Sequence, residues 1–350
     1  MTSLQSERKR VNEELPNELL KKLYYNSRNS INQLGKELGI SSHTVSKYLS
    51  VYEKQYGLDY TISIDTRLLG FSEARIIAIK FGDKVPDIIL LKKVLGGELF
   101  VQNAYMATGD FDLILHVIAS NQVEFNYWLY KIRMNFCRYK PRIKIATLDY
   151  FIEGFLPVQN KLIEKTGNLK DCERKILLKL NENSRAKIKD IAKALNVSEM
   201  KVIYSIDKLI KKGIIKKFTT CIQKPEKRIF MFYGVSIILN EQHHSMFSVK
   251  FLNKILNMDK AEDITNDYSV VSETSGNFDF IYFCNFRDGE SFNEIGPNFI
   301  KNTWASEFPE LEQCILTTLI VGKWPFNKNG YVRLSKERDL EMKPSSIKVY

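Results

Sequence analysis

Two stretches of the chain, 17–60 and 169–217, place apolar residues every three or four positions in three short runs. This is the period of amphipathic helices, so each stretch predicts three helices. A tight bend separates the second and third runs, Gly39-Ile40-Ser41 in one block and Asn196-Val197-Ser198 in the other. Gly and Asn tolerate the left-handed backbone that such a bend needs, and each block therefore predicts a helix-turn-helix.

Polar residues at the expected helix ends support this interpretation. Ser30 and Gln33 have the spacing of a capping box. Asp171 and Ser198 stand where they would cap the first and third helices of the second block. Gly213 ends that third helix, and the extended segment after it is expected to form a wing.

After each helical block the pattern changes to strand, helix, strand, strand, helix, strand, with β-branched and aromatic residues in the strands. In the first copy we expect strands at 74–81, 98–108, 111–119 and 142–152 and helices at 85–95 and 121–136. In the second copy we expect strands at 229–239, 265–274, 278–286 and 310–321 and helices at 246–257 and 290–303. This order predicts a four-stranded antiparallel sheet with both helices on one face, a ferredoxin-like sandwich. We expect the two uncovered sheet faces to bury each other, within one chain or between two.

The two halves also align in sequence. Residues 34–41 match 191–198 at an offset of 157, and the turn 108–112 matches 275–279 at an offset of 167. We therefore expect an α+β protein, a tandem duplication of a winged helix-turn-helix followed by a ferredoxin-like βαββαβ domain. The expected parts are a polar N-terminal tail (1–16), a first winged helix-turn-helix (17–70), a first ferredoxin-like domain (71–156), a linker (157–168), a second winged helix-turn-helix (169–224), a second ferredoxin-like domain (225–326) and a basic C-terminal tail (327–350).

The net charge of +11 is concentrated in one segment. Residues 169–217 carry 14 Lys and Arg against 6 Asp and Glu, whereas residues 17–60 carry 6 against 4. A basic patch of this density points to nucleic acid, because phosphate contacts need Lys and Arg on one surface. No apolar run reaches the ~20 residues needed to span a bilayer. We therefore expect a cytoplasmic protein without a membrane partner.

The spacing of potential ligands argues against a metal centre. The five cysteines and four histidines are scattered, without the paired spacing that zinc sites use. We therefore expect no metal site, no cofactor and no catalytic residue.

A helix-turn-helix reads DNA by placing its second helix in the major groove, where the first residues of that helix reach base edges. We expect such contacts to double-stranded DNA from Ser42, His43, Thr44 and Lys47 in the first block and from Glu199, Met200, Lys201, Tyr204 and Ser205 in the second. Phosphate contacts are expected from Lys208, Lys211, Lys212, Lys216 and Lys217. The charge balance indicates that the second block is the main reader.

Taken together, these features resemble the leucine-responsive regulator/AsnC (Lrp/AsnC) family, particularly its tandem-duplicated archaeal members. The resemblance rests on the helix-turn-helix, the segment 60–70, the turn Gly109-Asp110-Phe111-Asp112, and Arg185 with the segment 209–215. It implies a transcription regulator that forms homo-oligomers through its ferredoxin-like domains. It also implies an amino-acid or other small-molecule effector near the turn between the second and third strands.

The effector residues that the resemblance implies lie in the two matching turns. They are Gly109, Asp110 and Asp112 in the first copy and Gly276, Asn277 and Asp279 in the second. Gly-Asp and Gly-Asn are also what a tight two-residue hairpin requires for its backbone alone, so a purely structural role stays open.

Two other functions fit the same domain plan. Some haem-pathway decarboxylases share it, but they need histidine and arginine around a tetrapyrrole that carries many carboxylates. His116, within a predicted strand, fits a sheet residue better than such a site. A DNA-independent interaction protein would use the helical blocks only as a scaffold. Three tryptophans are expected in cores or at interfaces, namely Trp128, Trp304 and Trp324.

Overall fold

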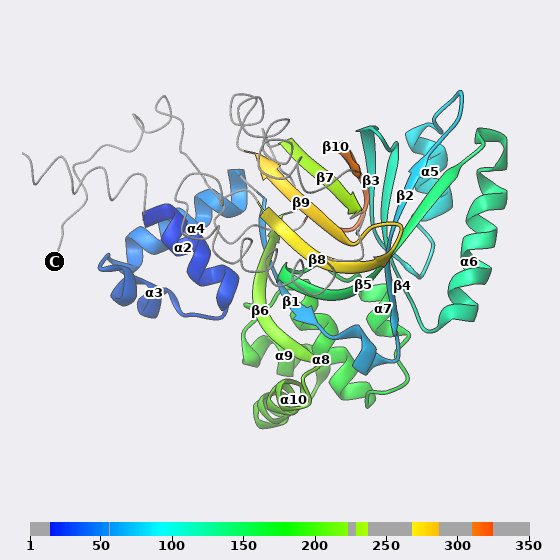
Figure 1. Ribbon diagram of the computed structural model, residues 1–350. Helices are drawn as coiled ribbons and strands as arrows, with labels where there is room; N and C mark the ends of the chain where they lie inside the picture. Colours follow the sequence, from blue (N-terminus) through cyan, green and yellow to red (C-terminus); the bar gives the residue numbers. More distant parts are fainter. Residues whose placement is uncertain (1–14, 56, 223–228, 237–267, 287–309, 325–350) are drawn as a thin grey trace, which may run out of the picture. The chain divides into compact units, whose positions relative to one another are not determined.

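The computed structural model describes residues 15–55, 57–222, 229–236, 268–286 and 310–324, which belong to two compact units (Figure 1). Each unit combines segments that are distant in the chain. The helical unit contains the described residues within 15–65 and 169–222. The barrel unit contains those within 66–168 and 229–324. The expected helices at 246–257 and 290–303, residue Trp304 and most of the two tails lie outside the described residues.

The helical unit contains both predicted three-helix blocks. The first consists of α2 (Leu15–Tyr25), α3 (Ile31–Leu38) and α4 (Ser42–Gln55). The second consists of α8 (Asp171–Glu182), α9 (Ile188–Leu195) and α10 (Glu199–Lys211). Both bends take the expected left-handed backbone, with φ of 68° at Gly39 and 52° at Asn196. Both blocks thus have the succession of helix, bend and helix that the apolar pattern predicts.

Two of the three predicted caps are confirmed, and one is wrong. Ser30 Oγ accepts from Gln33 N at 3.1 Å, and Ser198 Oγ accepts from Lys201 N at 3.2 Å. Lys170 is the N-cap of α8, without a side-chain cap bond, and Asp171 is the first helical residue. The Asp171 carboxylate instead pairs with the side chains of Arg174 and Lys175, at 2.5 and 2.7 Å. It still lies in the first turn, where the helix dipole favours a negative charge.

The two wing strands pair with each other. Strand β1 (Leu58–Ile64) runs antiparallel to β6 (Ile215–Ile222) (Figure 1). Thr61 lies opposite Thr219. Helix α2 packs against β6, and α8 packs against β1, so each wing contacts the first helix of the other block. Buried hydroxyls hold these contacts, because Thr219 Oγ1 donates to Tyr24 O at 2.7 Å and Thr61 Oγ1 to Asn181 O at 3.0 Å.

The barrel unit contains eight strands close to the predicted positions. Those of its first half are β2 (Glu73–Lys80), β3 (Val101–Gly109), β4 (Leu113–Ala119) and β5 (Arg142–Gly154). Those of its second half are β7 (Ile229–Ser236), β8 (Tyr268–Gly276), β9 (Phe280–Phe286) and β10 (Glu310–Val321). Within each half the strand order is the same, β5-β2-β4-β3 and β10-β7-β9-β8, and all pairings are antiparallel.

The expectation of two separate sheets that pack face to face is corrected by the structure. Strand β3 pairs with β10, and β5 pairs with β8, so the eight strands form one closed barrel. An open sheet leaves the N–H and C=O groups of its edge strands unpaired, and closure satisfies both edges of both sheets. The halves of the barrel unit are therefore joined by backbone hydrogen bonds as well as by apolar contact.

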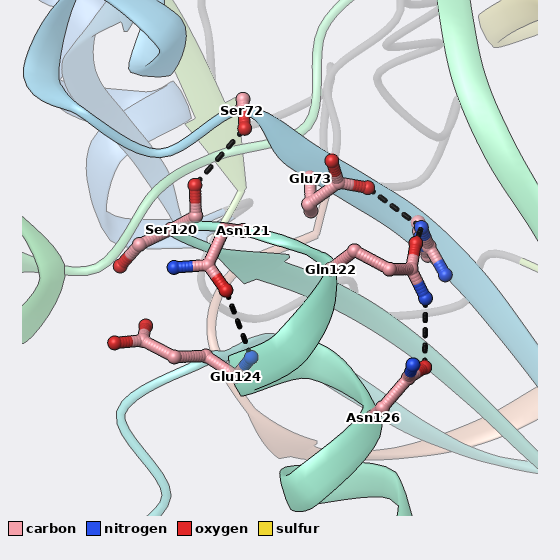
Figure 2. A network of polar contacts seen from close by, with 8 residues as sticks. Ser72, Glu73, Ser120, Asn121, Gln122, Glu124 and Asn126 are labelled. Carbon is pink, nitrogen blue, oxygen red and sulfur yellow. Dashed lines mark hydrogen bonds and ion pairs between the residues drawn. The ribbon is translucent and has the colours of Figure 1, made fainter.

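Helices α5 (Ile88–Leu95) and α6 (Gln122–Asn135) cover the outside of the first half of the barrel. Figure 2 shows how α6 begins: Asn121 Oδ1 accepts from Glu124 N at 2.9 Å, and Gln122 Nε2 donates to Asn126 Oδ1 at 2.7 Å. Gln122 Oε1 also accepts a hydrogen bond from the guanidinium group of Arg75 on β2. The core under α6 includes Trp128, which confirms that tryptophan as a buried residue, and Trp324 is buried as well.

The segment predicted as a linker, 157–168, contains a short helix, α7 (Asn160–Glu164). Its Leu162 and Ile163 side chains are fully buried, and Thr166 Oγ1 donates to Leu69 O at 2.8 Å. This segment is therefore part of the packing of the barrel unit. Within the described ranges, every helix is too short or too polar to cross a membrane.

Candidate nucleic-acid interface

Helix α10 has one buried and one exposed face. Its buried stripe is Val202, Ile206 and Leu209. The opposite side exposes Glu199, Met200, Lys201, Ile203 and Tyr204, with Met200 at 72% and Tyr204 at 69% of their full accessible area. Large apolar side chains at such exposure usually indicate a surface that meets a partner. Four of the five base-contact candidates in this block lie on this face.

Ser205, the fifth candidate, does not belong to that face. Its side chain is 5% exposed, because position 205 follows Val202 by three residues and turns toward the same buried stripe. We therefore remove Ser205 from the set of base-contact residues.

The five phosphate-contact candidates fall into two groups. Lys211 and Lys212 are exposed at the end of α10. The other three each have an acidic or aromatic neighbour: Lys208 Nζ lies 2.5 Å from Glu173 Oε1, Lys216 Nζ lies 3.4 Å from Asp65 Oδ2, and Lys217 Nζ lies 3.4 Å from the centre of the Tyr24 ring. The hydrogen bond from Lys208 lowers the pKa of the Glu173 carboxyl and raises the pKa of Lys208. Both groups therefore stay charged, and their charges largely cancel.

Sequence reasoning missed a group of lysines on the neighbouring helix. Lys187 is the N-cap of α9, and Lys189 and Lys193 lie on the helix itself, all three exposed. In a helix-turn-helix the first of the two helices crosses the DNA backbone, where lysines bind phosphates. The charge count over 169–217 contained this signal, but it did not separate these lysines from the rest.

The first block offers fewer free groups. Ser42 Oγ donates to Asn32 Oδ1 at 2.7 Å, and the Thr44 hydroxyl lies 2.8 Å from Ser41 Oγ, which accepts from Thr44 N and so caps α4. His43 and Lys47 are exposed. Of the four candidates in this block, these two are therefore the ones whose side chains no described local contact occupies.

The two turns proposed for effector binding have matching contacts in the barrel. Asp110 N donates to Gln313 O at 2.9 Å, and Asp110 Oδ2 accepts from Gln313 N at 2.7 Å. Asn277 N donates to Ile145 O at 2.9 Å, and Asn277 Oδ1 accepts from Ile145 N at 2.8 Å. Each turn thus binds a strand of the other half of the barrel, β10 or β5. One acceptor oxygen is enough for this role, so Asp and Asn serve equally.

The glycines before these residues are required by the backbone. Gly109 has φ of 137° and Gly276 has φ of 115°, values that side chains disfavour. A Cβ at Gly109 would lie 2.7 Å from Gln313 O, and one at Gly276 would lie 2.6 Å from Ile145 O. The close approach of turn and strand therefore depends on glycine at both positions.

The fourth residue of each turn, Asp112 or Asp279, also forms hydrogen bonds. Asp112 Oδ1 pairs with Lys80 Nζ, and Asp112 Oδ2 accepts from Phe81 N, both at 2.8 Å. Asp279 N donates to Val235 O at 2.9 Å. The side-chain oxygens of Asp110, Asp112 and Asn277 and the backbone N–H of Asp279 thus already hold the barrel together. Effector binding at these turns stays a prediction, and the structural role of the turns is what the contacts display.

His116 lies on β4 on the face away from α5 and α6, which in a closed barrel is the inside. Asn103 Nδ2 donates to His116 Nδ1 at 3.0 Å and to Pro157 O at 2.9 Å. Burial lowers the pKa of His116 from 6.5 to about 3, so the imidazole is neutral. This agrees with the interpretation of His116 as a sheet residue.

Comparison with known proteins finds relatives for part of the chain, including the second helical block. A model of winged helix-turn-helix DNA-binding domains matches residues 170–216. The chain is 32% identical over 111 residues to the HTH-type transcriptional regulator LysM of Sulfurisphaera tokodaii, covering 31% of this chain and 76% of LysM. It is 28% identical over 125 residues to an uncharacterized HTH-type transcriptional regulator of Pyrococcus furiosus, covering 36% of this chain and 77% of the regulator.

Among solved structures, the siroheme decarboxylase NirDL is similar over most of its length. The match covers 90% of this chain and 95% of NirDL, with a TM-score of 0.54 and 13% sequence identity. At this identity the similarity shows a shared fold alone.

Proposed function

Because the chain belongs to the Lrp/AsnC-like family of helix-turn-helix transcriptional regulators, we propose that it binds specific sites in double-stranded DNA through α10. One observation carries this proposal: the exposed face around Lys201 and Tyr204 continues into the exposed pair Lys211 and Lys212. A face with hydrogen-bonding and apolar groups, bordered by cations, suits a major groove bordered by phosphates.

The exposed side chains at α10 can contact different chemical groups of the DNA. Lys201 and Tyr204 can donate to base acceptors, Glu199 can accept from the amino group of cytosine, and Met200 can contact a thymine methyl group. Lys211 and Lys212 bind phosphates, together with Lys189 and Lys193 of α9 and its N-cap Lys187. Phosphate contacts supply affinity and position the helix, and the base contacts supply specificity.

We also infer that the chain is a tandem duplication in which one polypeptide carries two DNA-reading blocks. The paired wings, the equal strand order of the two copies and the equivalent turns at Asp110 and Asn277 support this. Family members with one block per chain need two subunits to present two blocks. Here one chain presents both, so its operator would consist of two unequal half-sites.

A salt titration tests the electrostatic part of the proposal. If 6–10 phosphates are neutralised, affinity for a duplex should fall roughly 10³–10⁵-fold between 50 and 200 mM salt. Lys211→Ala with Lys212→Ala should flatten the log–log slope by about 2. Lys175→Ala with Lys179→Ala on α8 removes the same charge from ion-paired side chains and serves as the control. Equal slopes for all three proteins would contradict the assignment of the interface.

The enzymatic alternative has less support in the described residues. Their two histidines are His43, exposed on α4, and His116, whose pKa of about 3 makes it a poor proton donor or acceptor near neutral pH. We therefore propose a regulator without catalytic activity. An absorbance titration with an iron tetrapyrrole separates the two functions, because a decarboxylase of this kind must bind its substrate and a regulator leaves the spectrum unchanged.

A further inference from the structure

Helix α6 lies on the outside of the barrel (Figure 1), and the side of it that does not pack on the core carries a second apolar stripe. Its members are Val123, Tyr127, Tyr130 and Met134, and their exposed fractions are 77, 69, 60 and 54%. The inner face of the same helix supplies Phe125, Trp128, Leu129 and Ile132 to the core. The inner face of this helix already packs on the core, so the outer apolar face contributes nothing to the packing of the same chain. An exposed apolar stripe of this kind normally contacts a partner.

The spacing of this outer stripe is four, three and four residues. Alternation of three and four places side chains along one seam of a helix, as in the a and d positions of a coiled coil. The stripe therefore fits a groove between side chains of another helix better than a flat surface.

The charged residues beside the seam change sign from one end of the helix to the other. Glu124 lies near the N-terminal end, as Figure 2 shows, and Lys131 and Arg133 lie near the C-terminal end, all exposed. Lys131 is also 3.6 Å from Glu98 of the same chain, and its side chain keeps 47% of its area exposed. A partner helix that runs the opposite way must therefore be basic beside Glu124 and acidic beside Lys131.

Helix α6 itself meets that description. We propose that the stripe of α6 pairs with the same stripe of a second copy of this chain, with the two helices antiparallel. Val123 then faces Met134 of the second copy, and Tyr127 faces Tyr130. Glu124 of each helix then faces the basic end of the other helix, so the favourable charge pairing occurs twice. A parallel arrangement would instead place Glu124 beside Glu124 and Lys131 beside Lys131, which is repulsive.

This contact is isologous, so it closes on itself and produces a dimer of chains. Such a dimer would carry four helix-turn-helix blocks. The proposal rests on α6 alone and does not depend on DNA binding by α10.

Static light scattering on the full-length protein tests the pairing. The wild type is expected at the mass of two chains or a multiple of it. Tyr127→Glu with Tyr130→Glu places charges along the seam and should halve the mass. Because both side chains are exposed, the tryptophan fluorescence of the folded protein should stay unchanged. Tyr150→Glu, at a tyrosine of β5 that is 66% exposed, is the control and should keep the wild-type mass. A single-chain wild type, or a double variant with unchanged mass, would overturn the proposal.

Disulfide trapping tests the direction of the helices, in a Cys137→Ser background because Cys137 is exposed. Eleven residues separate positions 123 and 134, about 16 Å along a helix. In the antiparallel pair, neither Val123→Cys nor Met134→Cys should link to its own kind, whereas a mixture of the two should give a covalent dimer. Self-linking of each single variant would indicate a parallel pair and overturn the proposed arrangement.

Discussion

Ser27 Oγ and Ser184 Oγ lie 2.6 Å apart inside the helical unit, although 157 positions separate the two residues in the chain. This separation equals the offset at which the two helical blocks align in sequence. Each serine also donates its N–H to the other block's wing, Ser27 to Phe218 O at 3.0 Å and Ser184 to Tyr60 O at 3.3 Å. Equivalent residues thus meet where the two blocks contact each other.

Substitution of these serines should give strongly non-additive stability changes. Ser27→Ala or Ser184→Ala alone leaves a buried hydroxyl with a lost partner and should reduce the free energy of unfolding by ~1–3 kcal/mol. The double variant removes both hydroxyls and should cost less than the sum. Urea unfolding followed by far-ultraviolet circular dichroism measures the free energy of unfolding of the wild type, the two single variants and the double variant. Strict additivity would mean that the two hydroxyls do not interact.

The two DNA-reading blocks should contribute unequally. Lys201→Ala with Tyr204→Ala should weaken binding to the preferred duplex by roughly 2–4 kcal/mol if each residue makes one base contact. His43→Ala with Lys47→Ala should cost less, because the first block has a smaller basic surplus and two of its four candidates bind locally. Fluorescence anisotropy on one duplex ranks both variants. A larger loss for the first-block variant would reverse the assignment.

The turn glycines should be among the residues least tolerant of a methyl group. Gly109→Ala and Gly276→Ala force a side chain into a positive φ and against a backbone oxygen, and each should destabilise the barrel unit by ~1–3 kcal/mol or more. Gly97→Ala is the matched control, since a Cβ there meets nothing within 4 Å. Tryptophan fluorescence during thermal unfolding reports on the barrel unit, because Trp128 and Trp324 are buried in it. Equal transition temperatures for the three variants would refute the structural role of the turns.

Acid should destabilise the barrel unit through His116. The folded state holds the pKa of this imidazole near 3, below its ordinary 6.5, so between these values the unfolded state binds the proton and the folded state does not. Stability from this group is therefore present above pH 6.5 and falls by roughly 1.4 kcal/mol for each pH unit below it. Urea unfolding at pH 7 and pH 5 should show a smaller difference for His116→Gln than for the wild type, whereas His43→Gln should behave as the wild type. A difference of wild-type size in His116→Gln would exclude His116 as the cause.

The candidate interface was predictable where it depended on one helix and its charge. The exposure of Lys201, Tyr204 and Lys211 follows from the period of α10. The burial of Ser205 conflicts with its polarity, and the pairing of Lys208 with Glu173 depends on how α10 packs against α8. Such details come from helix packing, which periodicity does not describe.

The sequence by itself determined the local structure of this protein. Apart from α7, apolar periodicity located the described helices and strands to within a few residues. Ser30, Gly39, Asn196 and Ser198 act through contacts within their own turn. Local contacts of this kind are encoded by neighbouring residues. The order of elements also implied two similar sheets and two similar helical blocks.

Only the tertiary structure decided how the two halves of the chain join. The pairing of β1 with β6, the closure of the barrel through β3 with β10 and β5 with β8, and the binding of Asp110 to Gln313 all connect distant parts of the chain. An edge strand presents the same N–H and C=O groups whatever its side chains, so its sequence does not name its partner. The partner is selected by which arrangement satisfies all edges together, and that is a property of the whole fold.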